Sequence, residues 1–261
     1  MTIQEKIAIV TGASSGIGKA TALALAKRGA CITLASRNTS ALAQVAQQVE
    51  DQGGEALVVT TDVTQQAQVN HMVQETRSRW GKVDILIANA GQYIRSPIAE
   101  LTIPVLENAM AVNFFGGVYS VLAVLPHMLA QKSGHIVIVS TMDARKPLPP
   151  DAPYAAAKSA LTGFGEVLRQ ELHGTGVSAT IITPGRVDTP LIEDLKVPWI
   201  SAKISAETVA RAIVKGIERR QSEVILPFQA KPLYFLNAIS PRLADWAVRF
   251  FNLQGWESGG G

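Results

Sequence analysis

Tyr154 and Lys158 are the residues whose types and spacing most directly suggest chemistry. Three alanines, Ala155–Ala157, separate them and predict a helix, on which side chains four positions apart share one face. A free tyrosine has a pKa of about 10, and a neighbouring cation lowers it. The pair could therefore act as a general acid and base near neutral pH. The alternative is an exposed pair with no chemical role.

A glycine-rich turn is the next candidate site. It reads Thr11-Gly12-Ala13-Ser14-Ser15-Gly16-Ile17-Gly18, after the first predicted strand and at the start of the first predicted helix. Glycines let the backbone turn tightly and approach a ligand, and a helix N-terminus offers free N–H groups to a pyrophosphate. A P-loop is excluded because Ala20 stands where that motif needs Ser or Thr. The turn predicts a nucleotide site; the alternative is a tight turn without a ligand.

Residues at the end of the second predicted strand bear on which nucleotide is bound. Ser36 and Arg37 follow that strand directly. In dinucleotide-binding folds an acidic residue here holds the adenosine 2′-hydroxyl, whereas a nearby arginine accommodates a 2′-phosphate. The pair favours NADP(H), with NAD(H) possible. The alternative is that Arg37 is an ordinary surface cation.

Polar or turn-forming residues also follow the third and fourth predicted strands. These are Asp62-Val63 and Asn89-Ala90-Gly91. Ligands of open α/β sheets bind at the carboxyl ends of the strands, so both segments are candidates for the same site. Asp62 could instead be a helix N-cap, and Asn89 and Gly91 plain turn residues.

Three further segments complete the candidate set. Asn113 lies inside an apolar helix, where it needs polar partners if it faces inward. Ser140 and Thr141 end the fifth strand, and Thr141 stands thirteen residues before Tyr154. The loop Pro184–Pro190 is rich in turn residues and could fold over a ligand or simply connect a strand to a helix.

Strands and helices alternate along the chain. Apolar runs predict strands at Ile7–Val10, Cys31–Ala35, Ala56–Thr60, Val83–Ala88, His135–Ser140, Val177–Ile182 and Glu223–Leu226. Helical patterns lie between them, at Gly16–Arg28, Thr39–Gln52, Gln65–Arg79, Thr102–Leu129, Tyr154–His173 and Ala206–Arg220. This order predicts a single-domain, Rossmann-like α/β fold: a doubly wound parallel sheet of about seven strands with helices on both faces.

Taken together, these motifs resemble the classical short-chain dehydrogenases/reductases, over about residues 5–226. The resemblance rests on the glycine turn, Asp62, Asn89-Ala90-Gly91, Asn113, Tyr154 with Lys158, and Pro184-Gly185 with Thr189. It implies an NAD(P)(H)-dependent oxidoreductase that acts on a carbonyl/alcohol pair, as a homodimer or homotetramer.

The resemblance also implies residue roles. Tyr154 would donate the proton to the carbonyl oxygen, and Lys158 would lower the pKa of Tyr154 and hold the nicotinamide ribose. Asn113 would support Lys158 through an ordered water. Thr141 stands where the family usually has serine; it keeps a hydroxyl but adds a methyl group beside the substrate.

The implied cofactor-binding set combines all of these segments. It comprises Gly12, Ser14, Ser15, Gly16, Ile17, Gly18, Ser36, Arg37, Asp62, Val63, Asn89, Ala90, Gly91, Tyr154, Lys158, Pro184, Gly185, Val187 and Thr189. We expect the substrate to meet Gln92–Ser96, Met142–Arg145 and Asp188–Ile204.

Composition narrows the remaining possibilities. A net charge of +3 is too small to indicate a nucleic-acid partner, and the single Cys31 excludes a disulfide framework and favours the cytoplasm. No apolar run approaches the roughly 18 residues of a membrane span, and the four histidines lack metal-ligand spacing.

Residues 228–261 form a separate, aromatic-rich extension of the domain predicted for residues 1–227. Leu243, Trp246, Ala247, Phe250 and Phe251 follow a helical stripe. We expect this helix to dock on the chain's own core or on a second subunit; the alternatives are a lid on the substrate pocket and a membrane-surface helix. Ser258–Gly261 are expected to be disordered. Two other functions stay open: a cofactor-sensing protein without catalysis, and a reductase held at a membrane surface.

Overall fold

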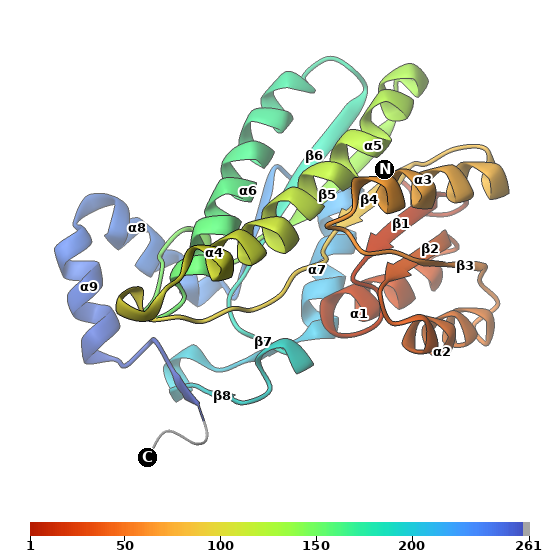
Figure 1. The fold of residues 1–261 in the computed structure, drawn as a ribbon. Coiled ribbons are helices and arrows are strands. Elements are labelled where there is room, and N and C mark those ends of the chain that lie inside the picture. Colours follow the sequence, from red (N-terminus) through yellow and green to blue (C-terminus); the bar gives the residue numbers. More distant parts are fainter. Residues whose placement is uncertain (258–261) are drawn as a thin grey trace.

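A parallel seven-stranded sheet forms the centre of the molecule in the computed structural model, which describes residues 1–257 (Figure 1). Its strands run in the order β10-β6-β5-β4-β1-β2-β3. They are β1 (Ile7–Thr11), β2 (Cys31–Ser36), β3 (Ala56–Thr60), β4 (Ile85–Ala88), β5 (Gly134–Val139), β6 (Val177–Pro184) and β10 (Glu223–Leu226). The predicted strands are confirmed, with small shifts at their ends.

Helices cover both faces of the sheet, as predicted. On one face lie α1 (Gly16–Ala26), α2 (Thr39–Glu50) and α7 (Ala206–Arg219). On the other lie α3 (Gln66–Trp80), α4 (Ile103–Met110), α5 (Gly116–Gln131) and α6 (Ala152–Glu171). Successive strand residues point to opposite faces, so Ala8 and Val10 join one apolar core while Ile9 joins the other. This explains why the strands are apolar throughout.

The predicted helix Thr102–Leu129 is observed as α4 and α5 joined by a π-helical turn, Ala111–Phe115. Within the described chain this run, Ile103–Gln131, is long and apolar enough to cross a membrane, with a mean hydropathy of 1.6. The expectation that no run reaches this length is therefore wrong. The run packs along α3, α6 and strands β4 and β5. Helices that cover a parallel sheet are buried along one side and need this apolar character.

The chain reverses its direction of winding beside β1. Strand β1 pairs with β2 on one side and with β4 on the other, so the connections after β1 and after β4 leave the sheet towards opposite faces. A crevice forms at the carboxyl ends of strands at such a point, and ligands of this fold class bind there. The architecture thus places the glycine turn and Asn89-Ala90-Gly91 at one edge.

The C-terminal extension forms a helical hairpin and a short strand. Helix α8 (Lys231–Ile239) contacts α9 (Pro241–Phe250), and β11 (Trp256–Glu257) pairs antiparallel with β8 (Leu195–Lys196). A second two-stranded pair joins β7 (Val187–Asp188) to β9 (Ile204–Ser205). In Figure 1 the hairpin lies at the end of the molecule away from α2 and α3.

Helix α9 contacts the rest of the described chain through its small residues, while the large aromatic side chains of its stripe are exposed. Trp246 is 53% exposed and Phe250 66% exposed, whereas the buried side chains of this helix are Ala244, Ala247 and Val248. Asp245, expected on the polar side, forms an ion pair with Lys146 and holds the helix to the domain. The inner side of α9 therefore uses small residues and an ion pair. The expectation for Ser258–Gly261 lies outside the described residues.

Candidate functional site

One cavity of about 790 Å³ lies at the carboxyl edge of the sheet and collects the predicted residues. Every residue of the predicted catalytic and cofactor-binding sets lines it except Gly18. The segments come from the ends of β1, β2, β3, β4, β5 and β6 and from helix α6. Tertiary structure thus brings together residues that lie up to about 175 positions apart in the sequence.

The glycine turn is shaped by close approaches of the backbone. Gly12 has a φ of +67°, and a Cβ atom there would lie 2.8 Å from Nδ2 of Asn89. A Cβ atom at Gly18 would lie 2.1 Å from the Gly12 carbonyl oxygen. Gly18 therefore lets α1 pack against the turn and does not line the cavity, which corrects its predicted place in the binding set.

Asn89 connects the end of β4 to the end of β1. Its Nδ2 donates to the carbonyl of Thr11 at 2.9 Å, and Thr11 Oγ1 accepts from the amides of Asn89 and Ala90 at 3.0 and 3.1 Å. These bonds hold two strand ends that lie on either side of the reversal in winding. Asn89 is thus more than a turn residue, because it fixes the floor of the cavity.

Arg37 and Asp62 lie at the end of the cavity formed by β2 and β3. Arg37 is exposed, and among residues 1–257 no ion pair to it is found. Asp62 Oδ1 accepts from the amide and the hydroxyl of Thr64 at 3.0 and 2.8 Å, which closes a local turn. The N-cap position of α3 is Gln65, so the alternative role of Asp62 as the N-cap is wrong.

Tyr154 and Lys158 lie side by side on the first turns of α6, which begins at Ala152. Tyr154 is only 8% exposed and Lys158 only 4% exposed, so the reading of an exposed, idle pair is wrong. The Lys158 ammonium donates to the carbonyl of Val139 at 2.9 Å. This bond ties α6 to the end of β5 and points the ammonium into the cavity wall.

The pKa values of the pair differ from the simple expectation. Burial raises the pKa of Tyr154 above its usual value, the charge of Asp143 raises it further, and a hydrogen bond with Thr141 opposes them. Burial also lowers the pKa of Lys158 to about 8. The Tyr154 pKa of the chain by itself is thus raised and not lowered as expected, because desolvation of the phenol is the largest contribution.

Asn113 is buried in the π-helical turn between α4 and α5. Its Oδ1 accepts from the amide of Gln92 at 3.0 Å, and its Nδ2 donates to the carbonyls of Gln92 and Ala109 at 2.9 and 3.1 Å. A Cβ atom at Gly91 would lie 2.8 Å from Asn113 Oδ1 and 3.5 Å from Lys158 Nζ. The amide and the ammonium therefore approach each other across Gly91, and the polar partners that a mid-helix asparagine needs are present.

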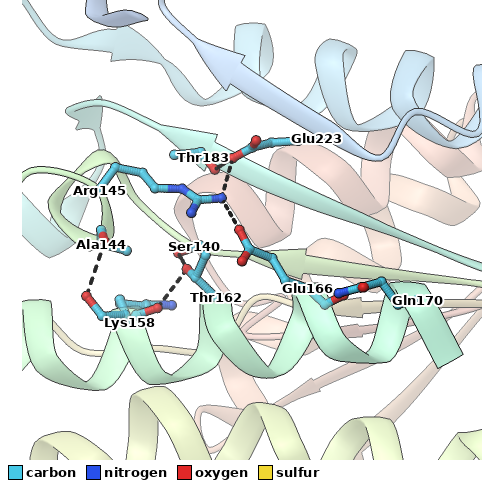
Figure 2. A network of polar contacts seen from close by, with 10 residues as sticks. Ser140, Ala144, Arg145, Lys158, Thr162, Glu166, Gln170, Thr183 and Glu223 are labelled. Carbon is cyan, nitrogen blue, oxygen red and sulfur yellow. Dashed lines mark hydrogen bonds and ion pairs between the residues drawn. The ribbon is translucent and has the colours of Figure 1, made fainter. Parts of the chain in front are cut away.

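The hydroxyls of Ser140 and Thr141 have different surroundings. Ser140 Oγ lies 2.6 Å from Oγ1 of Thr162, which in turn donates to the carbonyl of Lys158 at 2.8 Å (Figure 2). Thr141 Oγ1 instead donates to the Asp143 carboxylate at 3.3 Å and accepts from the Asp143 amide at 3.2 Å. The hydroxyl of Ser140 is thus bound to Thr162 on α6. The hydroxyl of Thr141 is bound within its own turn, in the cavity lining that also contains Tyr154.

An ion-pair network fixes the segment that follows Thr141. Arg145 donates to Glu166 on α6 at 2.6 Å and to Glu223 on β10 at 3.0 Å, and Thr183 on β6 donates to the same Glu223 oxygen at 3.1 Å (Figure 2). Charge-assisted bonds of this kind are short and strong. The network therefore ties Arg145, at the end of this segment, to the second half of α6 and to β10.

Sequence reasoning missed four side chains in and around the cavity. Tyr93 packs edge-on against Tyr154 with ring centres 5.1 Å apart, and its hydroxyl donates to Asp151 at 2.8 Å. Asp143 and Arg186 line the same space. Tyr93 and Asp143 lie in segments expected to meet the substrate, Arg186 lies in the loop Pro184–Pro190, and Asp151 lies in no predicted segment. Residue type and position could not show that these side chains gather around Tyr154.

The C-terminal segment is hydrogen-bonded to two arginines, Arg95 and Arg186, that lie near Tyr93 and Asp143. Arg95 donates to the carbonyl of Gln254 at 3.3 Å and Arg186 donates to the carbonyl of Leu253. Strand β11 pairs with β8, next to Leu191, Ile192 and Leu195, which line the cavity. Residues 253–257 are thus bound to the loop that borders the cavity, an arrangement that fits the alternative of a lid.

Comparisons with known proteins agree with this architecture. The family model described as short chain dehydrogenase matches residues 6–197. An uncharacterized oxidoreductase from Staphylococcus saprophyticus is 37% identical over 83% of this chain and 93% of its own. The ketoacyl reductase HetN from a Nostoc species is 32% identical over 97% of this chain and 91% of its own.

Solved structures show the same fold. A short-chain dehydrogenase/reductase from Burkholderia phymatum in complex with NAD superposes with a TM-score of 0.87 at 25% identity, covering 93% of this chain and 96% of the other. An alcohol dehydrogenase from Thermococcus sibiricus complexed with 5-hydroxy-NADP gives a TM-score of 0.77 at 24% identity, covering 85% and 96%.

Proposed function

Because the chain belongs to the short-chain dehydrogenase/reductase family, an oxidoreductase family that binds NAD(P), we propose that it interconverts a carbonyl compound and a secondary alcohol with NADP(H) as the preferred cofactor. The observation that carries the proposal is the burial of Tyr154 and Lys158 in the cavity that the glycine turn also lines. A cofactor-sensing protein without catalysis would have no use for a buried acid–base pair.

The residues present fit a dinucleotide. Gly12 adopts a left-handed backbone conformation in which a Cβ atom would clash with Asn89 and Ala90, so glycine shapes the turn that borders the cavity. The Ser15 side chain does not cap α1. The first amides of α1 are therefore free to bind phosphate oxygens. When bound, the nicotinamide supplies or accepts the hydride. Asn89, Gly91 and residues 184–189 border the space for its other end.

Tyr154 holds the proton that the carbonyl oxygen receives. Its raised pKa keeps the phenol protonated, and the edge-on contact with the Tyr93 ring orients the Tyr154 side chain. Lys158 lies one turn further along α6 with a pKa of about 8, so it can exchange a proton near neutral pH. Asn113 fixes the backbone at Gln92 beside this ammonium, and a water bridging the two would complete the path.

Replacing Tyr154 with phenylalanine tests the mechanism. The variant Tyr154→Phe removes one hydroxyl and should reduce kcat by at least about 1000-fold, because the general acid is lost at unchanged shape. Ketone-dependent loss of NADPH measures kcat, and a fluorescence titration measures NADPH affinity, which should stay within about threefold of the parent. Retained turnover in Tyr154→Phe would overturn the role of Tyr154.

Exposed apolar side chains favour an assembly beyond one chain. Leu122 and Phe115, next to or on α5, are 48% and 43% exposed, and Trp246 and Phe250 stand out from α9. We propose a homodimer or homotetramer in the cytoplasm, where the free Cys31 thiol stays reduced. The aromatic face of α9 with Arg242 and Arg249 favours a second candidate, a reductase that works at a membrane surface.

A further inference from the structure

Asp143 is a carboxylate fixed beside the predicted catalytic hydroxyls. It lies in a 3₁₀ turn, Met142–Ala144, for which Thr141 is the N-cap residue. Its amide donates to Thr141 Oγ1 at 3.2 Å, and its carboxylate accepts from the same hydroxyl at 3.3 Å. Thr141, Asp143 and Tyr154 line the same cavity, so the carboxylate of Asp143 stands in the space that also contains the reacting centre.

The two carboxylates of this region are partnered differently. Asp151 accepts from the Tyr93 hydroxyl at 2.8 Å and from Arg95 at 3.0 Å, so its charge is compensated. For Asp143, the described residues provide no ion pair, and its carboxylate bonds only to Thr141. A carboxylate offers about four acceptor positions. Asp143 therefore keeps acceptor capacity inside the cavity.

Electrostatics decide what kind of donor suits Asp143. Burial raises the pKa of Asp143 to about 7 and the charge of Asp151 raises it further, while Arg186 and Arg95 act in the opposite direction. With these two guanidinium groups and the Lys158 ammonium nearby, a cationic substrate group would meet several like charges. A neutral hydroxyl can donate to the carboxylate without that repulsion, so it is the better partner.

We propose that Asp143 selects substrates that carry a hydroxyl group on the carbon next to the reacting carbonyl. The carbonyl oxygen is placed by Tyr154 and Thr141, and Asp143 is one hydrogen bond further along from Thr141, which matches a neighbouring substrate hydroxyl. The inference rests on the proposed function and adds the substrate class: hydroxy ketones in one direction and vicinal diols in the other.

A pair of ketones of equal size tests this specificity. Hydroxyacetone and 2-butanone differ only in a hydroxyl replaced by a methyl group, so the ratio of their kcat/KM values reports recognition of the hydroxyl. We expect the parent enzyme with NADPH at pH 8 to favour hydroxyacetone at least about tenfold, because a site built to bond a hydroxyl rejects the analogue without it. Asp143→Ala should lower this ratio at least about tenfold.

Two further variants separate recognition from general damage. Asp143→Asn keeps an acceptor oxygen without the charge and should give an intermediate ratio. Asp51→Asn makes the same change at an exposed site after α2, outside the cavity, and should leave the ratio as in the parent. A titration with NADPH on each variant shows that the cofactor site is intact.

The outcomes are distinct. Equal kcat/KM values for both ketones in the parent, or an unchanged ratio in Asp143→Ala, would overturn the role of Asp143 and leave the oxidoreductase function standing. Reduction of neither ketone by a protein that binds NADPH would overturn the proposed function, and the inference with it.

Discussion

At the scale of single residues, Arg37 is the side chain that we propose to set the preference for NADP(H). It is exposed at the end of β2, beside Ser36, and its guanidinium is bound by no carboxylate of the described residues. A guanidinium binds a phosphate through charge-assisted, often bidentate bonds, whereas a neutral ribose hydroxyl gains little from it. The 2′-phosphate of NADPH should therefore interact with Arg37.

We predict that Arg37→Ala weakens NADPH binding at least about tenfold, or about 1.4 kcal/mol, and leaves NADH binding within about twofold. Equilibrium titrations with both cofactors measure this. Arg77→Ala, which removes an exposed arginine from α3, serves as the control and should change neither affinity. Equal affinities for NADPH and NADH in the parent protein would contradict the preference.

The pKa values of Tyr154 and Lys158 show why burial matters as much as spacing. A Tyr–Lys pair four residues apart on an exposed helix would be governed by mutual attraction. Here both groups are buried, and desolvation favours the neutral form of each. It therefore raises the pKa of Tyr154 and lowers that of Lys158. The phenol therefore keeps its proton more firmly, and the ammonium can release one at about pH 8.

At the scale of elements, α9 presents an apolar face that residues 1–257 leave uncovered. Trp246 and Phe250 stack with ring centres 4.9 Å apart and are more than half exposed. Burying such side chains stabilises an interface by about 1.5–3 kcal/mol each. The face is therefore suited to a second subunit.

We predict that the double variant Trp246→Ser, Phe250→Ser lowers the oligomeric state, measured by light scattering on a size-exclusion column. Trp199→Ser removes an 88% exposed aromatic from outside α8 and α9 and should leave the state unchanged. Vesicles of anionic lipid test the second candidate. Flotation of the parent that is lost in the double variant, with the oligomer intact, would show that the face binds membranes and not a subunit.

At the scale of the whole molecule, a buried histidine connects folding to pH. His135 on β5 is fully buried, with its ring nitrogens 2.9 Å from Thr180 Oγ1 and 2.8 Å from Ser178 Oγ. Burial, and the positive charges of Arg220 and the N-terminus, lower its pKa from 6.5 to about 4. Between about pH 4 and pH 6.5, His135 therefore binds a proton in the unfolded chain but not in the folded chain.

The contribution of neutral His135 to the free energy of unfolding is thus fully present above pH 6.5. It is lost as the pH falls from 6.5 towards about 4. At pH 5 the loss relative to pH 7 should be about 2 kcal/mol. Denaturant unfolding at both pH values measures it, and His135→Asn should remove most of the difference. His71→Asn, on the surface of α3, is the matched control. An undiminished pH dependence in His135→Asn would assign the effect to other groups.

Local patterns were sufficient for the parallel sheet, its flanking helices and the edge where the site forms. Apolar runs become strands because helices cover both faces, and the glycine turn must stand at the first strand–helix junction. In a parallel sheet all strands point the same way, so their carboxyl ends lie at one edge. Ligands of open α/β sheets bind at that edge. Of the catalytic and cofactor-binding residues predicted from the sequence, all line the cavity except Gly18, which packing assigns elsewhere.

Tertiary structure alone decided the rest. The pKa of Tyr154 depends on burial and on Asp143, and the gathering of Tyr93, Asp143, Asp151 and Arg186 depends on how three loops meet. The direction of the α9 aromatics depends on which side of the helix the domain covers, since an amphipathic pattern defines a face but not its partner. Local spacing determines the helices and strands and where they end. Contacts between distant segments, and the effect of one buried charge on another, arise only when those segments pack together.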